Sequence, residues 1–173
     1  MPEVHTEVNS PISLFLAGLL LKLGILGILR FILCSCYLSL RCLGSYLFYS
    51  IPLIACLIVS CSCYRFFDIK KIIALSPILH SNLNIVSIGA LNCIGVLCGI
   101  ITPISHGFSS VGSFLFAGLL IQKIYSRYLD GFFFIDAIYR GYSLGFLLAN
   151  VNFPGSFNFV GEIFASISIV QID

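Results

Sequence analysis

Charge is scarce in this sequence. Only 9% of its 173 residues are Asp, Glu, Lys or Arg, whereas 59% are hydrophobic and the mean hydropathy is +1.08. Soluble domains carry about 25% charged residues, so this composition excludes a soluble enzyme and predicts an integral membrane protein. The net charge of +2 is too small to indicate a nucleic-acid partner. Because no polar stretch is long enough for a soluble domain, we expect residues 1–173 to form a single transmembrane domain.

The motifs that hold redox cofactors are also missing. There is no Gly-rich nucleotide loop, and none of the eight cysteines forms the Cys-x-x-Cys pair of zinc or iron–sulfur sites. We therefore expect this chain to bind no cofactor or metal, to have no redox active site, and to pack its cysteines between helices. The cluster of Glu3, His5 and Glu7 is interpreted as a surface loop, not as a metal site. Tryptophan is absent and phenylalanine reaches 16, a skew typical of biased codon usage in an organelle genome.

Long apolar segments, each of about 20 residues or more, predict an all-α fold: a polytopic transmembrane helix bundle with about five crossings. The predicted crossings cover residues 12–33, 43–64, 72–91, 93–124 and 138–170. No basic region stands before the first of them, which argues against a cleaved signal peptide. The first crossing is therefore expected to stay in the membrane.

Prolines beside polar residues predict breaks in the later crossings. Pro103 lies in the sequence TPISH, and Pro154 lies in NVNFPGSFN. Proline has no backbone N–H and clashes with the carbonyl four residues earlier, which would free the carbonyls of Gly99 and Asn150. Lipid cannot satisfy such groups, so we expect discontinuous helices that face protein or a hydrated cavity. A further proline, Pro77, lies in the third crossing.

Basic residues divide unevenly between the two sides of the predicted bundle. One side has only two, Arg30 and Arg41. With alternating crossings, the other side has Arg65, Lys70, Lys71, Lys123, Arg127 and Arg140. The positive-inside rule places this richer side, and with it the N-terminus, in the matrix or cytoplasm.

Four ionisable residues lie inside the apolar segments: Lys22, His80, His106 and Glu162. A charge at the centre of a bilayer costs about 2.5–3.5 kcal/mol on insertion scales, so it needs a compensating role. Lys22 has roughly ten apolar residues of helix, about 15 Å, on each side, which makes snorkelling to a surface poor. Histidine suits proton relay because it titrates near neutral pH, and neighbouring hydroxyls and amides can order water. Together the four predict a proton path at mid-depth.

Five segments, in order along nearly the whole chain, resemble motifs of a known family. They are residues 2–8 (PEVHTEV), 16–31 (LAGLLLKLGILGILRF), 68–82 (DIKKIIALSPILHSN), 104–115 (ISHGFSSVGSFL) and 153–162 (FPGSFNFVGE). These are similar to motifs of the antiporter-like subunits of NADH:ubiquinone oxidoreductase, respiratory complex I. The set resembles subunit 4 more than subunits 2 and 5. Two departures are Ile25, where the family often has Gly or Ala, and Pro77, where it has Ser.

The resemblance implies roles for the four ionisable residues. Lys22 matches the lysine of the proton channel's central axis, His80 and His106 match its two histidines, and Glu162 matches the carboxylate at its distal end. The resemblance also implies a proton-translocating subunit of the mitochondrial inner membrane, with the lipid bilayer and other complex I membrane subunits as partners. FMN, iron–sulfur clusters and ubiquinone are implied in other subunits.

The family has about seven helices before the first of these motifs and further helices after the last. One of the earlier helices has a glutamate partner for the lysine. The chain is therefore expected to be a C-terminal-half fragment of subunit 4, completed by a separate chain that carries the N-terminal half.

Two other interpretations stay open. A monovalent cation/proton antiporter or a membrane-hydrogenase subunit would share the same motifs. A structural membrane fragment that conducts no protons would also have this composition, although the retention of all four ionisable positions argues against it. The sequence leaves open the side from which protons are taken up and the coupling mechanism.

Overall fold

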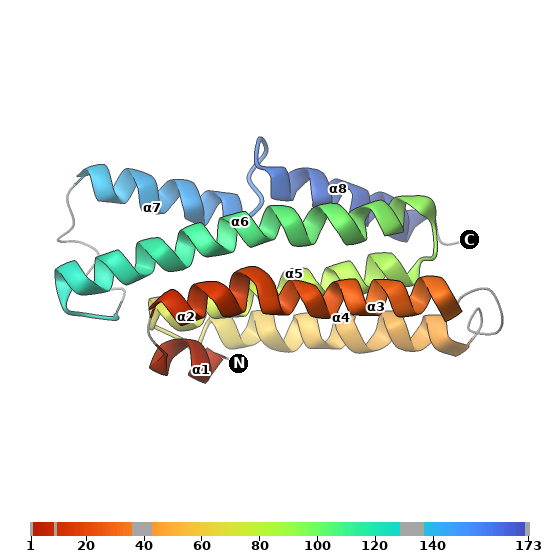
Figure 1. Ribbon diagram of the computed structural model, residues 1–173, viewed down its shortest axis with the longest axis horizontal. Coiled ribbons are helices and arrows are strands. Elements are labelled where there is room, and N and C mark those ends of the chain that lie inside the picture. Colours follow the sequence, from red (N-terminus) through yellow and green to blue (C-terminus); the bar gives the residue numbers. More distant parts are fainter. Residues whose placement is uncertain (1, 9, 36–42, 129–136, 172–173) are drawn as a thin grey trace.

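The computed structural model describes residues 2–8, 10–35, 43–128 and 137–171 of the chain (Figure 1). Within these ranges the chain is helical, with an isolated bridge between Asp68 and Tyr128 and no strand, which confirms the all-α prediction. The helices are α1 (Pro2–Glu7), α2 (Ser10–Phe15), the π-helix η1 (Leu16–Leu20), α3 (Leu21–Ser35), α4 (Leu43–Cys63), α5 (Ile69–Gly89), α6 (Cys93–Ile124), α7 (Ala137–Asn150) and α8 (Phe157–Val170).

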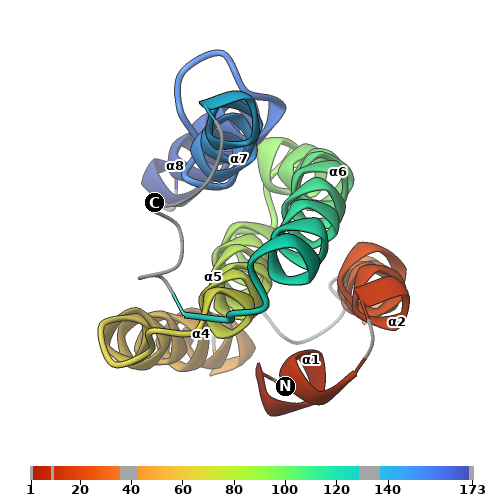
Figure 2. The same cartoon turned by 90° about the vertical axis from the view of Figure 1, so that its left-hand side faces the viewer.

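The long helices run side by side, with α5 and α6 at the centre of the bundle (Figures 1 and 2). Helix α5 contacts α4 on one side and α6 on the other, while α6 also packs against the α2–η1–α3 helix, α7 and α8. Among the described residues, three helices are long and apolar enough to cross a membrane: Pro11–Leu33, Ile69–Gly89 and Cys93–Ile124. Because α5 and α6 contact most of the other helices, their side chains can reach most of the interior of the bundle.

The first crossing is one helix that changes winding at its middle. Helices α2, η1 and α3 follow one another without interruption, and η1 inserts a π-helical turn at Leu16–Leu20. A π turn widens the helix and shifts its hydrogen-bond register, and such turns occur frequently at functional sites. This turn ends at Leu20, so only Leu21 separates it from Lys22.

The last crossing is a broken helix, as its sequence predicts. Helix α7 ends at Asn150 and α8 begins at Phe157. Asn152 takes the left-handed conformation at φ 60° and Gly155 has φ 106°, a region that Asn tolerates and that Gly enters without steric cost. Ser156 then caps α8, because its side chain accepts a hydrogen bond from the Phe159 N–H at 3.3 Å. The NVNFPGS sequence thus ends helix α7 and begins helix α8.

The predicted break at Pro103 is wrong, because α6 continues through it from Cys93 to Ile124. Pro77 also lies inside a continuous helix. Hydroxyl side chains beside the two prolines bond to backbone carbonyls, which is how prolines are tolerated inside membrane helices. The Ser76 hydroxyl donates to the Ile73 carbonyl, the group that Pro77 leaves free, at 2.9 Å. Next to Pro103, the Thr102 hydroxyl donates to the Cys98 carbonyl at 2.8 Å.

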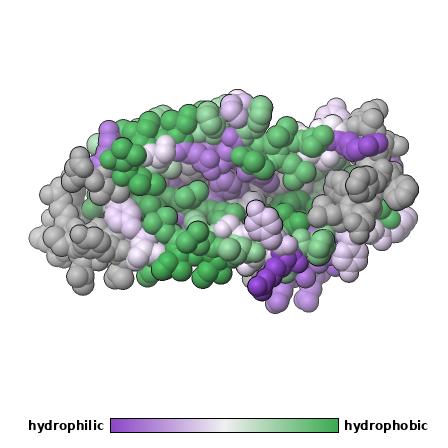
Figure 3. All heavy atoms as spheres, turned by 180° about the vertical axis from the view of Figure 1, so that it is seen from behind, coloured by the Kyte–Doolittle hydropathy of each residue, from purple (hydrophilic) through white to green (hydrophobic). Residues whose placement is uncertain are grey.

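The bundle buries polar side chains beside two apolar core clusters and exposes large hydrophobic side chains. Many of its exposed side chains are large and hydrophobic, such as Leu57 at 67% exposure, and a hydrophilic band interrupts the hydrophobic surface near the middle of the back (Figure 3). Its most deeply buried polar residues include Asn84, Ser87, His106, Ser110 and Ser168. An exposed apolar surface around buried polar groups is expected of a membrane bundle with a polar interior path.

Cysteines do not all pack between helices as expected. Cys98 is fully buried, but Cys61 and Cys93 are exposed. Cysteine is apolar enough to face lipid, so exposure at an apolar surface carries little cost.

The basic segments gather at one end of the bundle. The Ile69 N–H donates to the Arg127 carbonyl at 3.2 Å, and the Arg127 guanidinium donates to the Thr6 carbonyl at 3.3 Å. Lys123 lies over the Tyr139 ring, 4.1 Å from its centroid. The end of α1, the α4–α5 turn and the end of α6 therefore share one end of the bundle, as alternating crossings predict.

The start of α5 is held without a side-chain cap. Asp68 stands at the N-cap position, but its side chain makes no capping hydrogen bond. Instead its carboxylate pairs with the Lys71 ammonium at 3.3 Å, and the backbone pairs with Tyr128. The helix start is therefore fixed by the neighbouring chain segment more than by its own cap.

The N-terminal segment is a short surface helix, not the surface loop that the sequence suggested, and it turns one side chain, His5, into the bundle. His5 is only 1% exposed, and its ring stacks on Phe114 of α6 at 5.0 Å between centroids. Neither ring nitrogen has a hydrogen-bond partner. Burial therefore lowers the pKa of His5 below its ordinary value of 6.5.

This burial predicts that α1 detaches from the bundle at acidic pH. A lowered folded-state pKa means that the undocked helix binds a proton first, so docking is at full strength above about pH 6.5 and weakens below it. The loss is up to about 1.4 kcal/mol per pH unit. Hydrogen exchange of residues 2–8, corrected for the intrinsic rate, should accelerate between about pH 7.5 and about pH 5.5. His5→Phe keeps the stacking and should remove this acceleration; an equal acceleration in that variant would contradict the role of His5.

Candidate functional site

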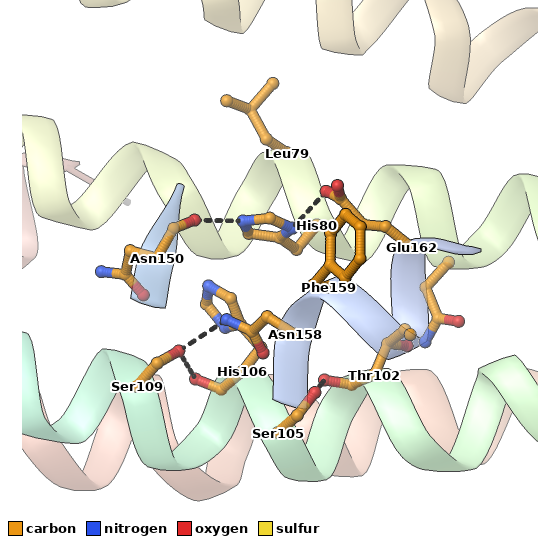
Figure 4. A network of polar contacts seen from close by, with 12 residues as sticks. Leu79, His80, Thr102, Ser105, His106, Ser109, Asn150, Asn158, Phe159 and Glu162 are labelled. Atoms are coloured by element: carbon orange, nitrogen blue, oxygen red, sulfur yellow. Dashed lines mark hydrogen bonds and ion pairs between the residues drawn. The ribbon is translucent and has the colours of Figure 1, made fainter. Parts of the chain in front are cut away.

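All four ionisable residues predicted from the sequence meet in the middle of the bundle. Lys22 comes from α3, His80 from α5, His106 from α6 and Glu162 from α8. Figure 4 shows His80 between Glu162 and His106, with residues of the α7–α8 break beside them. The folded bundle thus brings together side chains that lie up to 140 residues apart, from Lys22 to Glu162, in the sequence.

Lys22 lies half-buried at one end of this group. Its ammonium donates to the Ala17 carbonyl inside η1 and lies 3.4 Å from His106 Nδ1. The π turn shifts the backbone register just before Lys22, so a carbonyl of the lysine's own helix can accept from its side chain. The side chain is therefore held back along its own helix and points its charge at α6.

The two histidine rings lie against each other. Their centroids are 4.5 Å apart and their planes are inclined by 43°. His106 is 3% exposed and lies between Lys22 and His80. An ammonium can only donate, so the Lys22 contact assigns an acceptor lone pair to Nδ1 of a neutral His106 and its proton to Nε2.

His80 bridges the carboxylate and the broken helix. Its Nε2 lies 3.2 Å from the Asn150 carbonyl, and its Nδ1 lies 3.6 Å from Glu162 Oε1. The Asn150 carbonyl is free because the residue four positions later is Pro154, which has no N–H. A carbonyl only accepts, so Nε2 of His80 holds a proton and Nδ1 is the atom that can exchange one with Glu162.

Two asparagines from the break fasten it to α6. The Asn150 amide donates to the Ser113 hydroxyl at 3.1 Å. The Asn158 amide donates to the Ser109 hydroxyl at 2.9 Å and to the Ala149 carbonyl at the end of α7 at 3.0 Å. These bonds satisfy backbone and side-chain groups that the break exposes, and they fix α8 so that Glu162 reaches His80.

Two small cavities flank the histidine pair. One, of about 10 Å³, is lined by Lys22, His80 and His106, among others. The other, of about 20 Å³, is lined by both histidines, Asn158 and Glu162, among others. A buried water needs about 10–15 Å³, so the second cavity can hold one water and the first is at the lower limit.

Sequence reasoning missed some residues of this polar interior. It counted Lys70 only as one of the basic residues on the richer side, yet Lys70 is 7% exposed at the start of α5, whereas the Lys71 side chain is 29% exposed. Lys70, Pro77 and Asn84 recur every seven residues and are all buried, so a helical reading of this heptad spacing would have placed Lys70 on the inward face. Lys70 lies about 15 Å along the helix from His80. Asn158 was noted as part of the break but not as a contact of the site.

The arrangement consists of side chains that can exchange protons with one another. In the part of the chain that the structure describes, no three His, Cys, Asp or Glu side chains gather as potential ligands. The four ionisable side chains contact one another directly, and hydroxyls and amides of α6 and the α7–α8 break lie beside them.

Comparison with known proteins identifies the kind of membrane protein. Residues 1–172 match the family model described as NADH:quinone oxidoreductase/Mrp antiporter, TM. The chain is 34% identical over its full length to NADH-ubiquinone oxidoreductase chain 4 of Chondrus crispus, of which the match covers 36%. It is 33% identical to the chain 4 protein of Marchantia polymorpha, over 99% of this chain and 35% of that protein. It is 30% identical to NADH-quinone oxidoreductase subunit M of Rhodobacter capsulatus, over 100% of this chain and 34% of that protein.

The chain thus spans about a third of the length of the curated relatives it matches. The family match itself runs from end to end of the chain and includes the helices that supply all four ionisable residues. The chain belongs to the NADH:quinone oxidoreductase/Mrp antiporter family of membrane proteins.

Proposed function

We propose that this chain forms part of a proton-translocating membrane subunit of NADH:ubiquinone oxidoreductase and relays protons along Lys22, His106, His80 and Glu162. One observation carries the proposal. The four side chains come from four helices of an apolar bundle and contact one another in series. Isolated ionisable residues in a membrane are costly, and a connected series of them is the arrangement that proton transfer requires.

The contacts define the order of transfer. The Lys22 ammonium can give a proton to His106 Nδ1, 3.4 Å away. His106 then releases its Nε2 proton, and a water between the two tilted rings would carry it to Nδ1 of His80, which faces Glu162 Oε1 at 3.6 Å. Both distances are longer than an ideal hydrogen bond, so small side-chain movements or an inserted water would complete each step.

The proposal places the chain in the mitochondrial inner membrane with its basic end, and α1, on the matrix side. FMN, iron–sulfur clusters and ubiquinone would lie in other subunits of the complex. The N-terminal half of a chain 4-like subunit would come from a separate chain. An apolar groove of about 630 Å³ between the α2–α3 helix and α6, with Lys22 on its wall, is the surface that we propose this half covers.

Two alternatives make different predictions. A cation/proton antiporter also fits the family description, which names antiporters, but the relatives described above are named as subunits of NADH oxidoreductases. A mass-spectrometric inventory of the native complex separates these, since NADH-oxidising subunits would favour the oxidoreductase. A structural fragment that conducts no protons is disfavoured. Four ionisable side chains in series are costly in an apolar bundle, and a purely structural role does not require them.

Lys22→Met in the assembled complex should lower coupled NADH:ubiquinone turnover by roughly tenfold or more, since a positioned proton donor is lost. Methionine keeps the length and apolar stem of lysine, so packing is preserved. The measurement is turnover and proton-to-electron ratio in proteoliposomes. The matched control is Lys71→Met, because Lys71 lies at the basic end in an ion pair with Asp68. An unchanged rate and ratio in Lys22→Met would remove Lys22 from the path.

A further inference from the structure

Three buried polar atoms without partners face one cavity. Asn84 Nδ2, His106 Nε2 and Asn158 Oδ1 have no hydrogen-bond partner, and their residues are 2%, 3% and 5% exposed. All three residues line the same cavity of about 20 Å³, together with Glu162. Each unsatisfied buried group costs free energy, so three around one small space indicate a shared ligand.

The orientation of Asn84 is fixed by its neighbours. Its oxygen Oδ1 lies 3.6 Å from the Cys98 thiol, which can donate a hydrogen bond to it. The Ser87 hydroxyl also lies 3.5 Å from Oδ1, but it donates its one proton to the Asn84 backbone carbonyl at 2.8 Å. With the oxygen turned toward the thiol, the amide NH₂ group is the part of Asn84 left for the cavity that this residue lines.

The groups around the cavity match the hydrogen-bonding capacity of one water. Asn84 Nδ2 and His106 Nε2–H are donors, while Asn158 Oδ1 and a Glu162 oxygen are acceptors. A water molecule accepts two hydrogen bonds and donates two, and buried waters need two to four polar partners. We propose that this cavity is a binding site for a single water, positioned by Asn84, which connects His106 directly to Glu162.

This site, which rests on the proposed proton relay, supplies a second route that bypasses His80. When Lys22 protonates His106 at Nδ1, the imidazolium releases its Nε2 proton to the water oxygen. The water releases one of its own protons to the Glu162 carboxylate in the same step. Lys22 ends as a neutral amine, His106 as the neutral Nδ1–H tautomer, the water unchanged and Glu162 as a carboxylic acid. Two routes, one through His80 and one through the water, therefore join His106 to Glu162.

A double-mutant cycle tests the two routes. Asn84→Leu removes the donor at similar volume, and His80→Phe blocks the ring route while it preserves stacking. Each single variant leaves one route open, whereas the double variant closes both. We expect the double variant to lower the coupled turnover of the assembled complex at least about threefold beyond the product of the single effects. Asn84→Thr, which restores a donor, should recover most of the rate in either background.

The outcomes separate this proposal from the relay itself. If the single effects multiply without excess, or if Asn84→Leu has no effect in the His80→Phe background, the water route is wrong while the relay stands. If neither Lys22→Met nor His80→Phe changes pumping, the relay itself is wrong. Variants that fail to assemble leave a test on the unmodified complex. Its high-resolution map should show water density within hydrogen-bond distance of Asn84 Nδ2 and His106 Nε2, and an empty cavity beside other resolved buried waters would overturn the proposal.

Discussion

Replacing His106 with leucine should abolish proton transfer through this chain, with coupled turnover reduced by roughly 100-fold or more. His106 contacts Lys22 through Nδ1 and His80 through its ring, and its Nε2 faces the cavity beside Glu162. Both proposed routes begin at this ring, so its loss cannot be compensated by either one. Leucine has a similar size and no polar atom, so it adds no unsatisfied group at this buried position, and the Lys22 ammonium keeps its bond to the Ala17 carbonyl.

The control is His5→Leu, which replaces another buried histidine that lies outside the series of contacts. Both variants lose a buried imidazole, but only His106→Leu should change the proton-to-electron ratio and the turnover of the assembled complex. Equal pumping by the two variants at equal assembly would contradict the assignment of His106 to the path.

The second large effect is structural. Gly95→Val should prevent assembly, because a Cβ atom at Gly95 would lie 2.2 Å from the backbone oxygen of Ser87. The clash is between α6 and the backbone of α5, so it can be relieved only if the two central helices move apart. That movement would also pull apart Asn84, Ser87 and Cys98, which lie where these helices meet. Overpacking costs about 1–3 kcal/mol even when side chains can shift, and backbone leaves less room for relief.

The amount of assembled complex on native gels measures this effect. Gly145→Val is the matched control, because Gly145 also lies inside a helix but nothing lies within 4 Å of an added Cβ. The two substitutions carry the same change in helix propensity, so that difference cancels. A similar loss of complex in both variants would point to propensity and not to the contact between α5 and α6.

The sequence predicted the last crossing more accurately than the one before it. Both contain proline beside polar residues, yet only the segment around Pro154 breaks. There, Asn152 and Gly155 can take positive φ and Ser156 can cap the next helix, so the sequence encodes an end and a new start. Pro103 has no such neighbours. Proline alone removes one hydrogen bond, which a helix in a packed bundle tolerates.

The burial of polar side chains was predictable for residues in the middle of apolar helices, but not for residues near the end of the bundle where α1 and the start of α5 lie. Lys22, His80 and His106 stand out because apolar residues surround them in the sequence itself. His5 and Lys70 lie in polar segments, where nothing local distinguishes a solvated side chain from a buried one. Only the docking of α1 and the end of α6 against α5 decides their burial.

By itself, the sequence determined that this protein is a bundle of apolar helices, which of its ionisable residues lie at mid-depth, and where the last helix breaks. These properties follow from composition, from helix length and from local backbone chemistry. The tertiary structure alone decided that Lys22, His106, His80 and Glu162 touch in that order, and that Asn84 and Asn158 face a common cavity. Contacts between helices depend on how each is rotated and packed against its neighbours, and no single segment contains that information.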